Sequence, residues 1–248
     1  MNAFREFSFK NNSEDLRDPQ EFGFLVEPWY FNQGLANSPT VLVREGVLKK
    51  LLVAKTKLPD GLNFKIWDGY RTIKTQTVLY MVLYKKIVQH RPLLAGAKAL
   101  KKTEEFVIRP SFDLQKPSPH NTGAAIDLTL VYPNGEEVDM GTAFDFFDKS
   151  SFTMHFRDAK EGTEEYEWHR NRMLLQSSLL EEGFYNFPDE WWHFSYGDRL
   201  WAEHYGKKAL YGSWELMRGG SSKTQTAEKI CGFLKIYLSY SWFAIRYS

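Results

Sequence analysis

The first long pattern in the chain has the period of a helix. In the segment RTIKTQTVLYMVLYKKIVQH, partly or wholly apolar residues recur at spacings of three and four, which predicts a helix with one buried face. The residues predicted to form that face are Ile73, Thr77, Tyr80, Tyr84 and Ile87. Pro92 cannot continue a helix, so we expect the helix to end before it.

A second helix is predicted in the segment TEEYEWHRNRMLLQSSLLEEGF. Thr163 is a candidate N-cap, since its hydroxyl can accept a hydrogen bond from a free N–H group of the first turn. Acidic residues fill that turn, where their negative charges interact favourably with the positive end of the helix dipole. Gly183 marks the end of the helix.

Strand patterns lie on either side of these helices. Residues 63–67 form a short strand that the pair Asp68-Gly69 stops. From Ala124 the pattern has period two, the pair Asn134-Gly135 predicts a hairpin, and EWWHFSY predicts a last strand. One face of the period-two strand carries Ile126, Leu128 and Leu130, and the other carries Ala125, Asp127 and Thr129. This order of elements predicts an α+β fold with an antiparallel sheet flanked by helices.

Composition and charge narrow the class of protein. The 248 residues are 43% hydrophobic and 25% charged, as in ordinary globular proteins. A formal net charge of +1 gives no reason to expect nucleic acid as a partner. Cys231 is the one cysteine, so neither an intramolecular disulfide nor a cysteine-based zinc site is predicted. The first residues lack the apolar segment of a secretory signal, and we expect a cytoplasmic protein.

The chain is expected to divide into a catalytic domain, residues 1–218, and a C-terminal part, residues 219–248. The latter begins with a linker-like GGSSKTQTAE and ends with an apolar, aromatic stretch. From Ile230 to Ile245 that stretch is short and contains Lys235, which argues against a transmembrane helix. We interpret it as a segment docked on the domain, with a membrane-interface anchor as the weaker alternative.

The segment SPHNTGAAIDLTL places a carboxylate inside an apolar strand. Burying the charge of Asp127 is costly unless something pairs with it, and a metal ion would. Gly123 can turn the chain so that His120 folds back beside Asp127. With His193 these residues make two nitrogen ligands and one oxygen ligand, a set that leaves a fourth zinc position open. From spacing alone, a surface loop followed by an edge strand is an equal alternative.

Glu190 strengthens the metal hypothesis. Residues three apart in a strict strand face opposite sides, but Pro188 favours a loop before His193. Glu190 can then hang from the loop end while His193 points in from the strand. A carboxylate that approaches the water without binding the metal is a general base.

Together, WDGYR, SPHNTGAAIDLTL, MGTAFD and EWWH resemble the D-alanyl-D-alanine dipeptidase family, zinc peptidases that include the vancomycin-resistance dipeptidases. The family pattern is Ser-x-His-x-x-Gly-x-Ala-x-Asp followed by Glu-x-x-His. The resemblance runs from about Gly23 to about Tyr211 and implies the fold shared by D-Ala-D-Ala peptidases and the hedgehog signalling domain. One departure is Thr72, where the family commonly has proline, and we expect the helix start to survive it.

The resemblance implies a role for each matching residue. It implies one zinc ion per chain, and its ligands are His120, Asp127 and His193. Glu190 is implied as the catalytic base and Arg71 as the residue that stabilises the transition state. Asp145 is implied as the partner of the substrate ammonium, and Ser118 as a pocket contact.

The predicted function is therefore zinc-dependent hydrolysis of D-alanyl-D-alanine. One alternative is a related D,D-carboxypeptidase or endopeptidase acting on longer peptidoglycan peptides, and another is a zinc-bearing binding module without activity. Asp145 argues against the first, and retention of Glu190 and Arg71 argues against the second. No oligomeric state is predicted, nor does the sequence distinguish antibiotic resistance from salvage of wall fragments.

Overall fold

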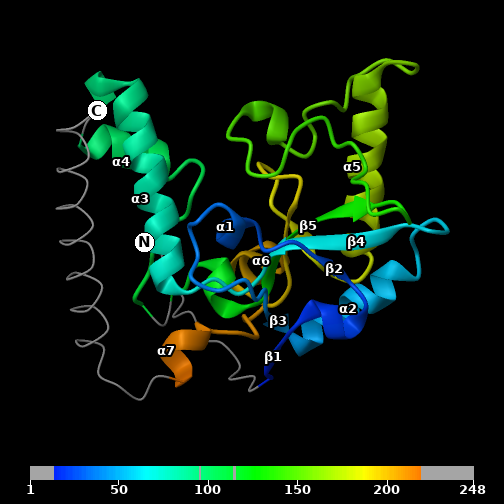
Figure 1. Ribbon diagram of the computed structural model, residues 1–248, viewed down its shortest axis with the longest axis horizontal. Helices are drawn as coiled ribbons and strands as arrows, with labels where there is room; N and C mark the ends of the chain where they lie inside the picture. Colours follow the sequence, from blue (N-terminus) through cyan, green and yellow to red (C-terminus); the bar gives the residue numbers. More distant parts are fainter. Residues whose placement is uncertain (1–13, 95, 114–115, 219–248) are drawn as a thin grey trace.

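The computed structural model describes residues 14–94, 96–113 and 116–218 (Figure 1). The predicted C-terminal part, residues 219–248, lies outside the described residues. Within those described ranges no helix combines the length and the apolar character needed to span a bilayer.

Five strands form the main sheet, in the order β2-β4-β5-β7-β6. The pairs β4/β5, β5/β7 and β6/β7 are antiparallel, as predicted, whereas β2 pairs with β4 in parallel. The fold is therefore α+β with a mostly antiparallel sheet. The strands are β2 (Leu25–Val26), β4 (Asn63–Asp68), β5 (Ala125–Val131), β6 (Tyr185–Asn186) and β7 (His193–Ser195), while β1 (Leu16–Arg17) and β3 (Val43–Arg44) pair separately.

Helices lie on both sides of this sheet (Figure 1). In chain order they are α1 (Trp29–Asn32), α2 (Glu45–Lys55), α3 (Ile73–His90), α4 (Ala97–Thr103), α5 (Glu164–Leu180), α6 (Arg199–Tyr205) and α7 (Trp214–Arg218). Short 3-10 turns are η1 (Pro19–Phe22), η2 (Pro92–Leu94), η3 (Pro119–Thr122) and η4 (Lys149–Ser151). Thr163 caps α5 through its side chain, as predicted, and Gly183 follows the helix with φ 82°.

The core lies between one face of the sheet and helices α2 and α5. Phe64 and Ile66 of β4 and Ile126 and Leu128 of β5 are fully buried there. Leu48, Leu51, Leu175 and Leu179 meet them from the two helices. This packing holds β5, the central strand, in place, and the opposite face of β5 carries Asp127.

Helix α3 ends before Pro92, as predicted, but the face that it buries is shifted from the predicted one. Ile73, Thr77 and Tyr80 are buried as expected, whereas Tyr84 and Ile87 are only half-buried. Their places are taken by Gln76, Leu79 and Leu83. The prediction failed because α3 packs against α4 and a cavity rather than against the sheet, and because a buried glutamine does not register as apolar.

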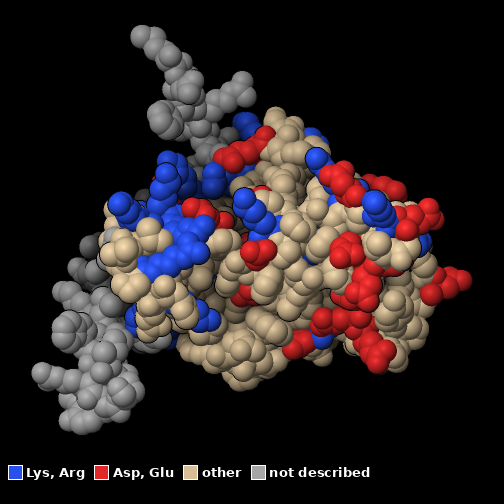
Figure 2. Space-filling view, turned by 90° about the horizontal axis from the view of Figure 1, so that it is seen from above, with Lys and Arg blue, Asp and Glu red and all other residues tan. Residues whose placement is uncertain are grey.

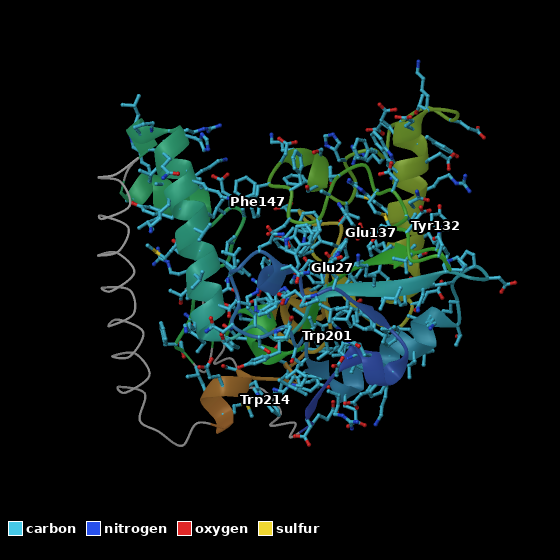
Figure 3. The ribbon with its side chains drawn as sticks, viewed as in Figure 1. Glu27, Tyr132, Glu137, Phe147, Trp201 and Trp214 are labelled. Carbon is cyan, nitrogen blue, oxygen red and sulfur yellow. The ribbon has the colours of Figure 1, made fainter. Side chains whose placement is uncertain are left out.

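The other strand predictions are confirmed in shortened form. The Asn134-Gly135 turn is present, but its second arm makes only an isolated antiparallel bridge between Val131 and Glu137. The strand predicted for EWWHFSY begins at His193, because residues 191–192 are in a turn. Glu27, which follows β2, and Glu137, which follows the turn after β5, both form ion pairs with Lys65 of β4 (Figure 3).

Charge is unevenly distributed over the surface. In Figure 2, Lys and Arg gather on the side of the molecule that α3 and α4 form, and Asp and Glu gather on the opposite side. The basic residues of α3 and α4 are Lys74, Lys85, Lys86, His90, Lys98, Lys101 and Lys102. The net charge is therefore close to zero even though basic and acidic side chains lie on opposite sides of the fold.

Candidate active site

The turn between β4 and α3 holds Arg71 in a fixed place. The N–H of Tyr70 donates to the carbonyl of Leu42 at 2.6 Å, and a Cβ on Gly69 would collide with that same carbonyl. Glycine is therefore needed where the two backbones approach. Thr72 accepts a hydrogen bond from the N–H of Thr75 at 3.0 Å, so it caps α3 and the helix start survives, as predicted.

His120 lies in the turn η3, which is joined directly to the Arg71 turn. Gly123 ends η3 with φ 72°, a left-handed conformation that favours glycine. The Nδ1–H of His120 donates to the carbonyl of Gly69 at 2.9 Å, and Asn121 Nδ2 donates to the carbonyl of Arg71 at 2.6 Å. These bonds unite two motifs that lie about fifty residues apart.

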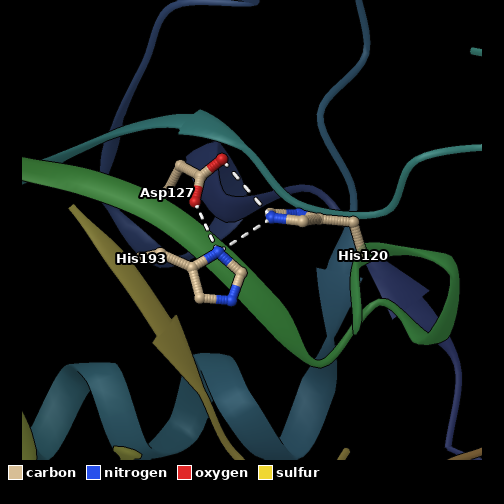
Figure 4. Close-up of side chains that lie close together, drawn as sticks. All are labelled: His120, Asp127 and His193. Atoms are coloured by element: carbon tan, nitrogen blue, oxygen red, sulfur yellow. Dashed lines mark hydrogen bonds and ion pairs between the residues drawn. The ribbon is translucent and has the colours of Figure 1, made fainter. Parts of the chain in front are cut away.

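His120, Asp127 and His193 form a buried cluster (Figure 4). Asp127 and His193 are paired residues on β5 and β7. His193 Nδ1 lies 3.0 Å from Asp127 Oδ1 and 3.1 Å from His120 Nε2, and His120 Nε2 lies 3.4 Å from Asp127 Oδ2. A tetrahedral ion about 2.0–2.2 Å from each donor would hold them about 3.3–3.6 Å apart. The cluster therefore fits a metal ion after small movements.

The tautomer of His120 also suits metal binding. A carbonyl can only accept, so Nδ1 carries the proton that is given to Gly69, and a neutral ring leaves a lone pair on Nε2. Burial opposes ionisation of Asp127, but the charge of His120 and hydrogen bonds from both imidazoles hold the pKa of Asp127 well below its usual range. Burial likewise opposes the charge on His120, yet Asp127 and Asp68 raise the pKa of His120 overall.

Glu190 lies beside this cluster, at the end of a loop, as predicted. Its N–H donates to the carbonyl of Phe187, and its own carbonyl accepts from Asn186 Nδ2 at 3.2 Å. Glu190 Oε2 lies 3.9 Å from His193 Nδ1. Burial raises the pKa of Glu190 to about 8, with the charges of Asp127 and Asp145 adding to the rise and His193 opposing it. The carboxyl group is thus near the cluster but outside the three-residue ligand set.

Asp145 projects from a strained loop position. Its φ of 60° is left-handed, and among the described residues it is the one non-glycine residue with positive φ. The neighbouring Phe144 stacks on Trp67, with ring centroids 4.5 Å apart and planes 12° apart. Burial raises the pKa of Asp145 to about 7, while the nearby Arg71 and a hydrogen bond from Tyr30 oppose that rise.

The loop that carries Asp145 is anchored by the buried Arg172 of α5. Arg172 Nε donates to the carbonyl of Met140 and Nη1 donates to the carbonyl of Phe152, both at 2.8 Å. Trp191 Nε1 adds a bond to the hydroxyl of Thr142 at 2.8 Å. Both ends of the loop are therefore fixed to α5, and the first end is also fixed to the residues just before β7.

One cavity brings all of the predicted site residues together. It is lined by Arg71, Ser118, His120, Asp127, Asp145, Glu190 and His193. The hydroxyl of Ser118 is 3.4 Å from the carbonyl of Arg109. Phe147 also lines this cavity (Figure 3). The centroid of its ring lies 5.6 Å from that of Phe106, which is on the α3–α4 side.

The structure adds residues that sequence reasoning missed. Asp68 accepts from Arg71 Nε at 2.9 Å and from Nη2 at 2.6 Å, and Tyr30 accepts from Nη2 at 3.3 Å. Asp68 and Arg71 lie close together in the motif WDGYR, and a carboxylate and a guanidinium group that are close in sequence can form an ion pair. The sequence could therefore have predicted this contact. Nothing in the sequence around Tyr30 or Gln76 indicates that the fold brings them here.

Comparisons with known proteins show which family the chain is similar to. The family described as D-ala-D-ala dipeptidase matches residues 32–210. The D-alanyl-D-alanine dipeptidase of Synechocystis sp. is 33% identical over 187 residues, which cover 69% of this chain and 75% of that one. The Enterococcus faecium dipeptidase is 31% identical over 167 residues, or 67% and 76% of the two chains.

The chain also matches a solved structure. It is a mutant of the vancomycin resistance D,D-pentapeptidase VanY in complex with Zn(II), with 16% identity and a TM-score of 0.39. The match covers 83% of this chain and 96% of that one.

Proposed function

The chain belongs to the D-Ala-D-Ala dipeptidase family of metallopeptidases, and we propose that it hydrolyses free D-alanyl-D-alanine with one zinc ion. The observation that carries the proposal is the shared cavity, where a buried two-histidine, one-aspartate cluster lies beside an unligated glutamate, an arginine and a second aspartate.

His120, Asp127 and His193 would hold the zinc ion. Such an ion acts as a Lewis acid that lowers the pKa of water and polarises the peptide carbonyl. Three protein ligands leave room for the reactants, as catalytic sites require. The outward bond from His120 to Gly69 fixes the imidazole in the orientation that ligation needs.

Glu190 is the general base of the proposed reaction. Its carboxylate takes a proton from the attacking water and passes it to the amine nitrogen of the leaving D-alanine. The C–O bond to the attacking water forms first and the C–N bond then breaks, so one water is consumed for each pair of alanines released. Burial raises the pKa of Glu190, and the positive charge of a nearby metal ion would lower it again, towards the range in which a base works at neutral pH.

Arg71 stabilises the negative charge that develops on the carbonyl oxygen. The guanidinium is buried and bonded to Asp68, which first among its neighbours raises the Arg71 pKa against the effect of burial. It therefore stays charged throughout the useful pH range. A fixed donor of this kind, in a site that excludes water, contributes a few kcal/mol to the transition state.

Asp145 selects the substrate by its free amine. An ammonium group can pair with the Asp145 carboxylate inside the cavity, whereas an acylated nitrogen cannot. A buried carboxylate left unpaired is unfavourable, so the site rejects blocked peptides. Ser118 lies in the same cavity as a pocket contact.

The test is a comparison of four substrates with zinc-loaded protein. D-Ala-D-Ala should be cleaved, N-acetylated D-Ala-D-Ala and a pentapeptide ending in D-Ala-D-Ala should not, and L-Ala-L-Ala should be cleaved weakly. Efficient cleavage of the pentapeptide would show a carboxypeptidase instead. No cleavage of any substrate would favour a zinc-bearing binding module.

A further inference from the structure

We infer that Gln76 is a positioning residue for Arg71. The side-chain amide of Gln76 forms one hydrogen bond with Arg71 and another with the cavity wall at Ile108. The inference rests on the proposed role of Arg71 in D-Ala-D-Ala hydrolysis. Gln76 lies on α3, five residues after Arg71, and its side chain lines the cavity.

The bonds of Arg71 show what Gln76 adds. Nε and Nη2 both donate to a single oxygen of Asp68, and Nη2 also donates to Tyr30. These bonds fix one edge of the guanidinium group, and the Tyr30 ring lies over its face, 4.7 Å from Cζ, but neither holds the opposite corner at Nη1. Nη1 donates to Gln76 Oε1 at 2.8 Å, which fixes the opposite corner.

This bond also determines where the free N–H of Arg71 points. A guanidinium group has five N–H donors in one plane. Within the described residues, Asp68, Tyr30 and Gln76 accept from four of them, and one N–H on Nη1 has no protein acceptor. Because the group is planar, holding one Nη1–H directs the other. We infer that the directed N–H is the one offered to the substrate oxygen.

The amide of Gln76 is suited to this bridge. Its Oε1 accepts from Arg71, and its Nε2 donates to the carbonyl of Ile108 at 2.6 Å, so only one orientation of the amide satisfies both partners. Gln76 is 2% exposed, and water cannot easily replace either bond. An amide adds no negative charge next to Arg71, which already faces Asp68 and Asp127.

The bridge connects the catalytic arginine to the wall of the cavity. Residues 104–108, which follow α4, line the cavity from the α3 side, and Ile108 is the last of them. Without the Gln76 donor the Ile108 carbonyl loses its partner, and without the acceptor Nη1 of Arg71 is no longer held. Both changes move groups that surround the substrate.

The primary test is Gln76→Met, which keeps length and helix propensity but removes both hydrogen bonds. We expect kcat for D-Ala-D-Ala to fall about 10- to 100-fold, as for a small misplacement of a catalytic group, with KM changed less than about threefold. Zinc content, which Gln76 does not contact, should be unchanged. The matched control is Thr77→Val on the same helix, which removes a buried hydrogen bond to the carbonyl of Ile73 and should leave kcat unchanged.

A double-mutant cycle separates positioning from general structural damage. In an Arg71→Ala background, Gln76→Met should lower the remaining kcat by less than about threefold, because its effect passes through Arg71. Independent, multiplicative effects of the two substitutions would overturn the inference. So would a Gln76→Met protein with the kcat of the wild type.

Gln76→Glu provides a second variant with a distinct signature. The neutral form of the new carboxyl can donate to Ile108 and accept from Arg71, whereas the ionised form cannot donate. The ratio of variant to wild-type kcat should therefore rise as the pH falls, and all other titrating groups are common to both proteins. A ratio that falls as the pH falls would overturn the inference. Wild-type protein that fails to cleave any dipeptide would overturn the proposed function and this inference with it, whereas the other adverse results overturn this inference alone.

Discussion

Replacing Asp145 by asparagine removes a charge from the cavity without disturbing the loop. Asp145 has φ 60°, and asparagine is one of the few residues that adopt this conformation at little cost. The stacking of Phe144 on Trp67 and the anchors from Arg172 remain in place. Any loss of activity in Asp145→Asn therefore reports the carboxylate itself.

The expected loss can be worked out from the ammonium contact. A hydrogen bond to a charged partner contributes about 1.5–3 kcal/mol. At 1.36 kcal/mol per factor of ten, kcat/KM for D-Ala-D-Ala should fall about 10- to 150-fold at pH 7.5. The preference for the free dipeptide over its N-acetylated form should shrink by a similar factor, because the variant no longer leaves a charge unpaired.

The pH profile gives the same substitution a second readout. Burial raises the pKa of Asp145 to about 7, so the carboxyl group is neutral below that pH and cannot pair with the ammonium. The amine of the dipeptide loses its proton at about pH 8. In the wild type, kcat/KM should therefore decline as the pH falls through 7, and the ratio of wild-type to Asp145→Asn kcat/KM should decline with it, because the titration of Glu190 is common to both proteins. The assay is release of D-alanine from pH 5.5 to 9. A variant that keeps the wild-type kcat/KM and acid limb would refute the ammonium role.

Two further predictions concern the metal cluster. Glu190→Gln should bind about one zinc per chain yet lose about 10²- to 10⁴-fold in kcat, whereas His193→Ala should lose the zinc, both measured by metal analysis and turnover; loss of zinc from Glu190→Gln would show that Glu190 is a ligand. In chelated protein the free energy of unfolding should fall as the pH rises from about 4 to 8, because Asp145, Glu190 and His120 have raised pKa values and the folded state holds more protons than the unfolded one. Urea midpoints at pH 5 and pH 8 measure this, added zinc should reverse the trend, and a midpoint that rises with pH in the chelated protein would contradict it.

The residues of the metal cluster could be singled out from sequence because their signals are local, and the family resemblance then favoured a metal site over an edge strand. Burying a charged residue in an apolar strand costs free energy, so the position of Asp127 predicts a positively charged partner. Gly123 supplies the turn that brings His120 back, and Pro188 frees Glu190 from the strand. The structure places these residues in one cavity, while their chemical roles stay predictions.

The surroundings of Arg71 could not be predicted because they depend on distant contacts. Tyr30 belongs to a four-residue helix that is too short to show a period, and it reaches Arg71 only through the fold. Gln76 is buried through its hydrogen bonds, whereas apolar periodicity selects residues that are buried through their hydrophobicity. Strands of two or three residues, such as β2 and β7, likewise carry too little pattern to reveal their pairing.

The anchoring of the Asp145 loop has a consequence for how this site can diverge. Arg172 grips the loop through the carbonyl oxygens of Met140 and Phe152, which are main-chain atoms that every amino acid possesses. These two contacts are therefore independent of the side chains that the loop displays, although the hydroxyl of Thr142 adds one side-chain anchor. Mutations can therefore change the side chains that the loop presents to a substrate while the hydrogen bonds at its ends remain. New specificities can be selected, or engineered, without changing the fold.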